Sequence, residues 1–112
     1  MKKIEAIFQS GKFDKVKEGL FKAGISGITV TDVTGYGFQK SKMNMLKGQD
    51  VSVELVPRVK LETVVKDNEA GKAMDIIINI TRTGRIGDGK IFVTDISDAV
   101  RIRTGEKGED AV

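Results

Sequence analysis

The order of hydrophobic patterns along the chain constrains its fold more than any other feature. Residues 2–8 form a short strand-like run, and residues 12–23 place apolar side chains at helical spacing before Gly24. Residues 28–34 are β-branched at six of seven positions, which favours a strand. The first third of the chain is therefore predicted to be a strand, a helix and a second strand.

The rest of the chain repeats this order after an interruption. Residues 37–55 keep no sustained period and are predicted to form a long loop, a feature that is usually functional in a small domain. Apolar and polar residues then alternate over 56–65, as in a strand. The stretch 69–82 has both helical spacing and a strand-like run at its centre, and we predict a helix. Residues 90–95 are predicted to be the last strand.

The predicted order βαββαβ is that of a ferredoxin-like α+β sandwich. A chain of 112 residues suits one domain, here 1–112. Both helices of such a sandwich cover one face of the sheet, and the bare face predicts burial by oligomerisation. Residues 100–103 alternate like an extended segment, and 104–110 read as a polar tail.

Composition excludes several kinds of chemistry. The chain has no Cys and no His, so disulfide scaffolds, thiol nucleophiles, Ser-His-Asp relays and Cys/His zinc sites are ruled out, and we predict no metal site. Lys and Arg number 19 against 16 Asp and Glu, a mild basic excess that suits anionic ligands. No apolar run is long enough to span a bilayer and no signal peptide opens the chain, so we expect a soluble cytoplasmic protein.

The glycine-rich turn at 84–90 matches the first seven positions of the P-loop pattern G-x-x-x-x-G-K. The eighth position is Ile91, which cannot hold Mg²⁺, and the turn leads from a predicted helix into a strand rather than the reverse. A nucleotide hydrolase of the P-loop type is therefore disfavoured. Gly87, Gly89 and Lys90 still suit an anion, although an ordinary mobile turn is the commoner meaning of such a composition.

Arg101 and Arg103 lie two positions apart on the predicted extended segment. Their side chains then project to the same side, which makes a fork for phosphate. A solvated strand face is an equally good account of the pair.

Several stretches together resemble the PII signal transduction proteins of the nitrogen-regulatory class, over nearly the whole chain. The most diagnostic are 82–93, Arg-Thr-Gly-Arg-Ile-Gly-Asp-Gly-Lys-Ile-Phe-Val, and 101–105, Arg-Ile-Arg-Thr-Gly. The resemblance implies a homotrimer that binds ATP or ADP in three clefts between subunits, with Mg²⁺ able to accompany ATP. It also implies that loop 37–55 changes shape to grip or release target proteins.

The resemblance assigns roles by position. The adenine is expected near Ile7, Thr29, Glu62 and Val64. The phosphates are expected in the turn 82–90, at Gly87, Asp88, Gly89 and Lys90, with Arg101 and Arg103 of the C-terminal segment 101–112 reaching in from a neighbouring subunit. The remaining nucleotide-site positions are Gly35, Gly37, Phe38, Gln39 and Phe92.

The chain also departs from the family. Phe38 replaces an Arg, Arg58 replaces a Lys, and Gln9-Ser10 replaces an Arg-Pro pair. In the family that Lys acts with the residue at Gln39 on 2-oxoglutarate, so Gln39 and Arg58 are the candidates for such a site here.

The resemblance implies a regulator and not an enzyme, with a membrane transporter or a metabolic enzyme as the target. Within loop 37–55 the residues expected to contact the target are Lys40, Lys42, Met43, Met45, Leu46 and Lys47. The main alternative is a small basic ferredoxin-like RNA-binding protein. RNA modules of this shape stack bases on aromatic side chains of the sheet, whereas only 5% of this chain is aromatic, so we expect no nucleic-acid partner.

Overall fold

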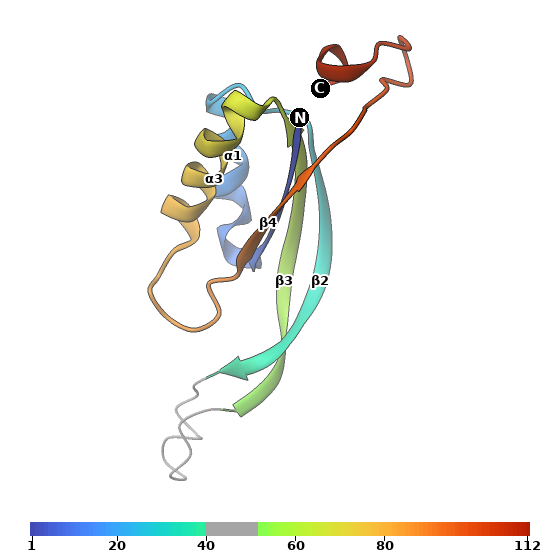
Figure 1. The fold of residues 1–112 in the computed structure, drawn as a ribbon. Helices are drawn as coiled ribbons and strands as arrows, with labels where there is room; N and C mark the ends of the chain where they lie inside the picture. The colour runs from blue at the N-terminus through green and yellow to red at the C-terminus, as the bar shows by residue number, and fades with distance from the viewer. Residues whose placement is uncertain (40–51) are drawn as a thin grey trace.

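The fold was analysed in a computed structural model, which describes residues 1–39 and 52–112. Within them an antiparallel sheet of order β2-β3-β1-β4 carries two helices on one face (Figure 1). The predicted α+β ferredoxin-like sandwich is confirmed. Its elements are β1 (Lys2–Gln9), η1 (Ser10–Lys12), α1 (Phe13–Lys22), β2 (Ile28–Gln39), β3 (Ser52–Val65), α3 (Asp67–Thr81), β4 (Lys90–Asp95) and η2 (Gly108–Ala111).

The core lies between the sheet and the two helices. Alternate residues of β1 and β3 are buried, since successive side chains of a strand point to opposite faces. Burying a large aliphatic or aromatic side chain stabilises the fold by roughly 1.5–3 kcal/mol. The most deeply buried large side chains are Phe8, Ile4, Leu20, Leu61, Ile77 and Val16.

No helix covers the opposite face of the sheet in the described part of the chain (Figure 1). We call this the open face. It carries ion pairs between neighbouring strands, with the Lys3 amine 2.7 Å from the Glu62 carboxylate and the Lys60 amine 3.8 Å from that of Glu5. The hydrogen bond from Lys3 lowers the pKa of Glu62, and the same bond raises the pKa of Lys3. The bare face predicted from the sequence is confirmed, and the trimer remains a prediction.

Gly24 ends α1 as the sequence predicts. Its φ of 85° is left-handed, a conformation that glycine adopts without strain. The Gly24 amide then donates to the Phe21 carbonyl (3.0 Å) and the Ile25 amide to the Leu20 carbonyl (2.9 Å), the bonding pattern of a Schellman motif. The predicted helix 12–23 is one residue too long at each end, because Lys12 belongs to η1 and α1 ends at Lys22.

The ambiguous segment 69–82 is helical, as predicted, and α3 includes the strand-like run at its centre. The helix begins two residues before the prediction, so Asn68 lies inside it and Lys66 is the capping position. Asp67 in its first turn pairs with the N-terminal amine of Met1 at 3.0 Å. An acidic residue at this end also suits the helix dipole.

The predicted loop 37–55 is too wide at both ends. β2 continues to Gln39 and β3 begins at Ser52, with Gln39 opposite Ser52, while residues 40–51 lie outside the described part of the chain. Gly35, which follows the predicted strand 28–34, lies inside β2 opposite Val56. It is accommodated because the Arg58 side chain of the facing strand lies across it, with Cγ 3.1 Å from the position a Cβ would take.

The extended segment predicted at 100–103 is also wrong. Only Val100 forms a β-bridge, with Lys107, and the chain turns at 102–104. Two backbone hydrogen bonds close this loop, from the Gly105 amide to the Arg101 carbonyl (2.7 Å) and from the Arg101 amide to the Glu106 carbonyl (2.8 Å). Local hydrogen bonding thus prevails over the alternating pattern, and the polar tail ends in η2.

Candidate functional site

The turn between α3 and β4 is held closed by one carboxylate. Asp88 accepts hydrogen bonds from the backbone amides of Thr83 (2.8 Å) and Gly84 (2.9 Å) and from the Thr83 hydroxyl. The Thr83 hydroxyl is the largest cause of the lowered pKa of Asp88. The Asp88 carboxylate is therefore already hydrogen-bonded within the turn. The backbone amide of Asp88 is the group that remains for a ligand.

The end of this turn is pressed against β1. Gly89 has a φ of 105°, and a Cβ there would lie only 1.9 Å from the Ile7 carbonyl oxygen. Only glycine fits a left-handed position so close to another backbone. Lys90 follows as the first residue of β4, opposite Ile7, so the turn delivers a cation to the sheet edge.

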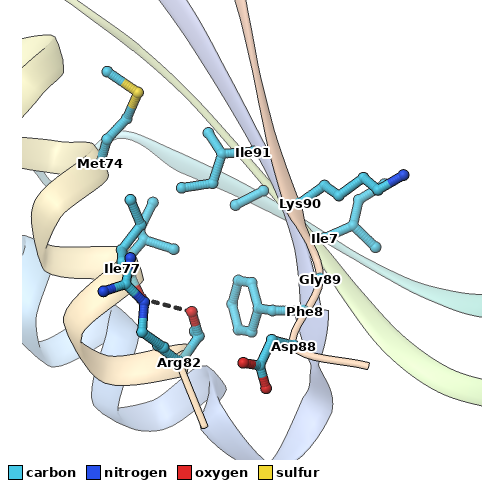
Figure 2. A pocket seen from close by; sticks show the side chains of 12 residues that line it. Ile7, Phe8, Met74, Ile77, Arg82, Asp88, Gly89, Lys90 and Ile91 are labelled. Atoms are coloured by element: carbon cyan, nitrogen blue, oxygen red, sulfur yellow. Dashed lines mark hydrogen bonds between the residues drawn. The ribbon is translucent and has the colours of Figure 1, made fainter. Parts of the chain in front are cut away.

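A cavity of about 420 Å³ lies beside this turn, between α3, β1 and β4. Met74, Ile77 and Ile91 give it apolar walls, and Asp88 lies at its edge (Figure 2). The Lys90 side chain points away from the cavity (Figure 2). No carboxylate of residues 1–39 or 52–112 forms an ion pair with Lys90. Its amine is thus available to an anion on the open side of the turn.

A second cavity, of about 780 Å³, lies toward the opposite edge of the sheet. It brings together three of the expected adenine residues with one of the expected phosphate ligands: Thr29, Glu62, Val64 and Arg101. The end of the chain contributes Ala111 and Val112 to the same cavity. Arg103 is exposed and does not line it.

Arg101 already has a partner. Its Nη1 lies 3.1 Å from Oε1 of Glu106, and their side chains are 41% and 44% exposed. A half-exposed pair of this kind is weak, since solvent screens it. An incoming phosphate would compete with Glu106 for the guanidinium.

One chain does not bring the two groups of residues together. The turn joins β4 at one edge of the sheet, whereas Thr29 lies on β2 at the other, with β3 and β1 between them. Strands are spaced by about 4.8 Å, so these edges lie roughly 14 Å apart. Ile7 lies on a central strand and Phe92 lies on β4 opposite Glu5.

The remaining predicted residues lie around the β2–β3 hairpin. Gly35 packs against Arg58, whose Nη1 donates to the Pro57 carbonyl at 3.2 Å. Gly37, Phe38 and Gln39 belong to β2 by their backbone. The predicted target-binding residues, Lys40, Lys42, Met43, Met45, Leu46 and Lys47, fall outside the described residues.

Sequence reasoning missed the residues that arrange this site. The hydrogen bonds between Thr83 and Asp88 could have been predicted from the sequence, because Thr and Asp side chains commonly bond to nearby backbone in turns. Gln9, which donates from its side-chain amide to the Gly87 carbonyl at 3.3 Å, had none, because 78 positions separate the two residues. Glu106 was treated only as part of a polar tail.

Two features are absent from the part of the chain that the structure describes. Over residues 1–39 and 52–112, no three acidic side chains come close enough to hold a metal ion. None of the helices in the same residues is long and apolar enough to cross a membrane.

Comparison with known proteins agrees with the fold. The family model for nitrogen regulatory protein P-II matches residues 1–106. Relatives named nitrogen regulatory protein P-II from Azospirillum brasilense and Bradyrhizobium diazoefficiens are 51% and 50% identical over all 112 residues, covering the whole of both chains. The relative from Pasteurella multocida is 47% identical with the same coverage. This chain therefore belongs to the P-II family of nitrogen regulatory proteins, which are signal transduction regulators.

Proposed function

We propose that this regulator senses adenine nucleotides in clefts between the subunits of a homotrimer. The observation that carries the proposal is that the turn joins the edge strand β4, whereas Thr29, Glu62, Val64 and Arg101 line a separate cavity toward the β2 edge. Two copies placed edge to edge bring the turn of one chain toward the Arg101 cavity of the next. A site divided in this way needs a neighbouring subunit to be complete.

Each half of the proposed cleft offers groups that suit one part of an adenine nucleotide. The turn offers backbone amides and the free Lys90 amine to phosphate, and the other half offers the Arg101 guanidinium. Glu62 and the backbone of Thr29 and Val64 supply acceptors and donors for a base. Mg²⁺ would be carried by ATP rather than by a protein site.

We further propose that the bound nucleotide controls a target protein through loop 37–55. A nitrogen-regulatory role follows from the family, and a membrane transporter or metabolic enzyme is the class of target that we expect. Co-purification with and without ADP tests this step. Recovery of the same proteins in both conditions would contradict nucleotide control.

Titration calorimetry with ATP and with ADP tests the sensing proposal. Both nucleotides should bind, and absence of heat with either would contradict it. Size measurement should give about three times the 12.2 kDa of one chain. Addition of 2-oxoglutarate to the ATP titration tests Gln39 and Arg58, since an unchanged ATP affinity would remove these residues from the sensing site.

RNA binding receives less support. The only aromatic side chain among residues 1–39 and 52–112 that shares the open face with Glu5 is Phe92. Base recognition on a sheet uses two or three such platforms.

A further inference from the structure

Gln9 connects the end of β1 to the middle of the glycine-rich turn. Its side-chain amide donates to the Gly87 carbonyl at 3.3 Å, in a partly buried position. The rest of the turn is fixed at two other points. Asp88 ties its beginning to Thr83 and Gly84, and Gly89 packs against the Ile7 carbonyl at its end.

This contact determines the direction of one peptide group. The chain has no cis peptide in its described part, and in a trans peptide the C=O and the following N–H point in opposite directions. Because the Gly87 carbonyl is directed at the Gln9 side-chain amide, the Asp88 N–H points away from that amide. Within residues 1–39 and 52–112, the N–H groups of Gly87, Asp88 and Gly89 donate to no protein acceptor.

We propose that Gln9 is a positioning residue for anion binding. It touches no phosphate itself and acts by holding the Gly87 peptide so that the neighbouring N–H groups face an anion. The proposal rests on the proposed function for the identity of the ligand, a polyphosphate. The orientation of the turn by Gln9 does not depend on that identity.

The first measurement needs no ligand. Backbone amide order parameters of residues 84–89 are compared between the full chain and the variants Gln9→Ala and Gln9→Glu, which lack the donor. The order of Gly87, Asp88 and Gly89 should fall in both. Gln9→Lys keeps a side-chain donor at this position, so the order of the turn should match that of the unaltered chain. Ser10→Ala is the matched control and should leave the order unchanged. Unchanged order in Gln9→Ala would overturn the proposal.

The second measurement uses tripolyphosphate and adenosine as separate probes. Loss of one positioning hydrogen bond should weaken tripolyphosphate binding roughly fivefold in Gln9→Ala. Adenosine binding should be unchanged, since adenosine carries no phosphate. An equal loss for both probes would overturn a role specific to the anion. If the unaltered chain bound tripolyphosphate but neither adenosine nor ADP, while Gln9→Ala lost order in the turn and affinity for tripolyphosphate, the proposed nucleotide sensing would fail and the positioning role would stand. If the unaltered chain did not bind tripolyphosphate, the positioning role would fail as well.

Discussion

The turn at 82–90 and the C-terminal loop at 100–107 present positive charge in two different ways. In the turn, the one nearby carboxylate, Asp88, is occupied by Thr83 and Gly84, which leaves the amides and Lys90 free. In the C-terminal loop, the Arg101 guanidinium is held by Glu106. The turn is therefore arranged before a ligand arrives, whereas Arg101 must exchange one partner for another.

This difference indicates that the turn and Arg101 contribute differently to binding in the proposed cleft. A preorganised group contributes affinity because little ordering is needed when the ligand binds. A group that exchanges partners gives a smaller net gain, and its movement accompanies binding. Changes in the turn should therefore have larger effects than changes at Arg101 or its partner.

The turn should be intolerant of change at Gly89. Gly89→Ala combines a left-handed φ with a Cβ placed 1.9 Å from the Ile7 oxygen, so we expect the free energy of unfolding to fall by about 3 kcal/mol. Gly84→Ala is the matched control, because Gly84 has a φ of 83° and nothing within 4 Å of the added Cβ. It should cost about 1 kcal/mol. Urea denaturation measures both, and equal losses would contradict the close packing of the turn on β1.

Removing the Lys90 amine should weaken polyphosphate binding strongly. A hydrogen bond to a charged group contributes about 1.5–3 kcal/mol, so Lys90→Ala should raise the Kd for ATP by roughly 10- to 100-fold. Calorimetry measures the change, with Lys107→Ala as the control. Similar affinities for Lys90→Ala and the unaltered chain would remove the turn from the site.

Releasing Arg101 from Glu106 should have a smaller and opposite effect. Exposed ion pairs contribute about 0.2–1 kcal/mol, so Glu106→Gln should tighten ATP binding by roughly two- to fivefold. Asp110→Asn removes the same charge farther along the chain and controls for net charge. If both variants tightened binding equally, the effect would be general electrostatics and the competition with Glu106 would be absent.

The Asp88 tie should appear as a weak pH dependence. The pKa of Asp88 is lower in the folded chain, mainly because the Thr83 hydroxyl bonds to the carboxylate. Its stabilising effect is therefore present above the unfolded pKa, about pH 4, and is lost as pH falls through the lower folded value. The stability difference between the unaltered chain and Asp88→Asn should shrink between pH 5 and strongly acidic conditions. A difference that grows in acid would contradict the sign of this shift.

Much of the fold could be predicted because its signals are local. The stop at Gly24 and the β-branched run at 28–34 depend on neighbouring residues only. The ends of loop 37–55 could not be predicted, because β2 and β3 are prolonged by pairing with each other and not by their own composition.

The candidate site, like the fold, could be predicted only in part. The family resemblance gave the residue types, but the contacts that arrange them join distant positions. The Gln9–Gly87 bond has no sequence pattern. Glu106 lies five residues from Arg101, yet the pair forms only because the chain turns at 102–104, where alternation predicted a strand.

If the nucleotide site is divided between subunits, mixing two variants that each lack one part of it should restore complete sites. Lys90→Ala removes the cation of the turn and Arg101→Ala removes the guanidinium of the opposite half, so each variant alone should bind ATP more weakly than the unaltered chain. After co-refolding of equal amounts, clefts between the intact turn of one variant and the intact Arg101 of the other should bind ATP at the original affinity, in roughly one quarter of the sites. No recovery of high-affinity binding in trimers shown to contain both variants would contradict the account.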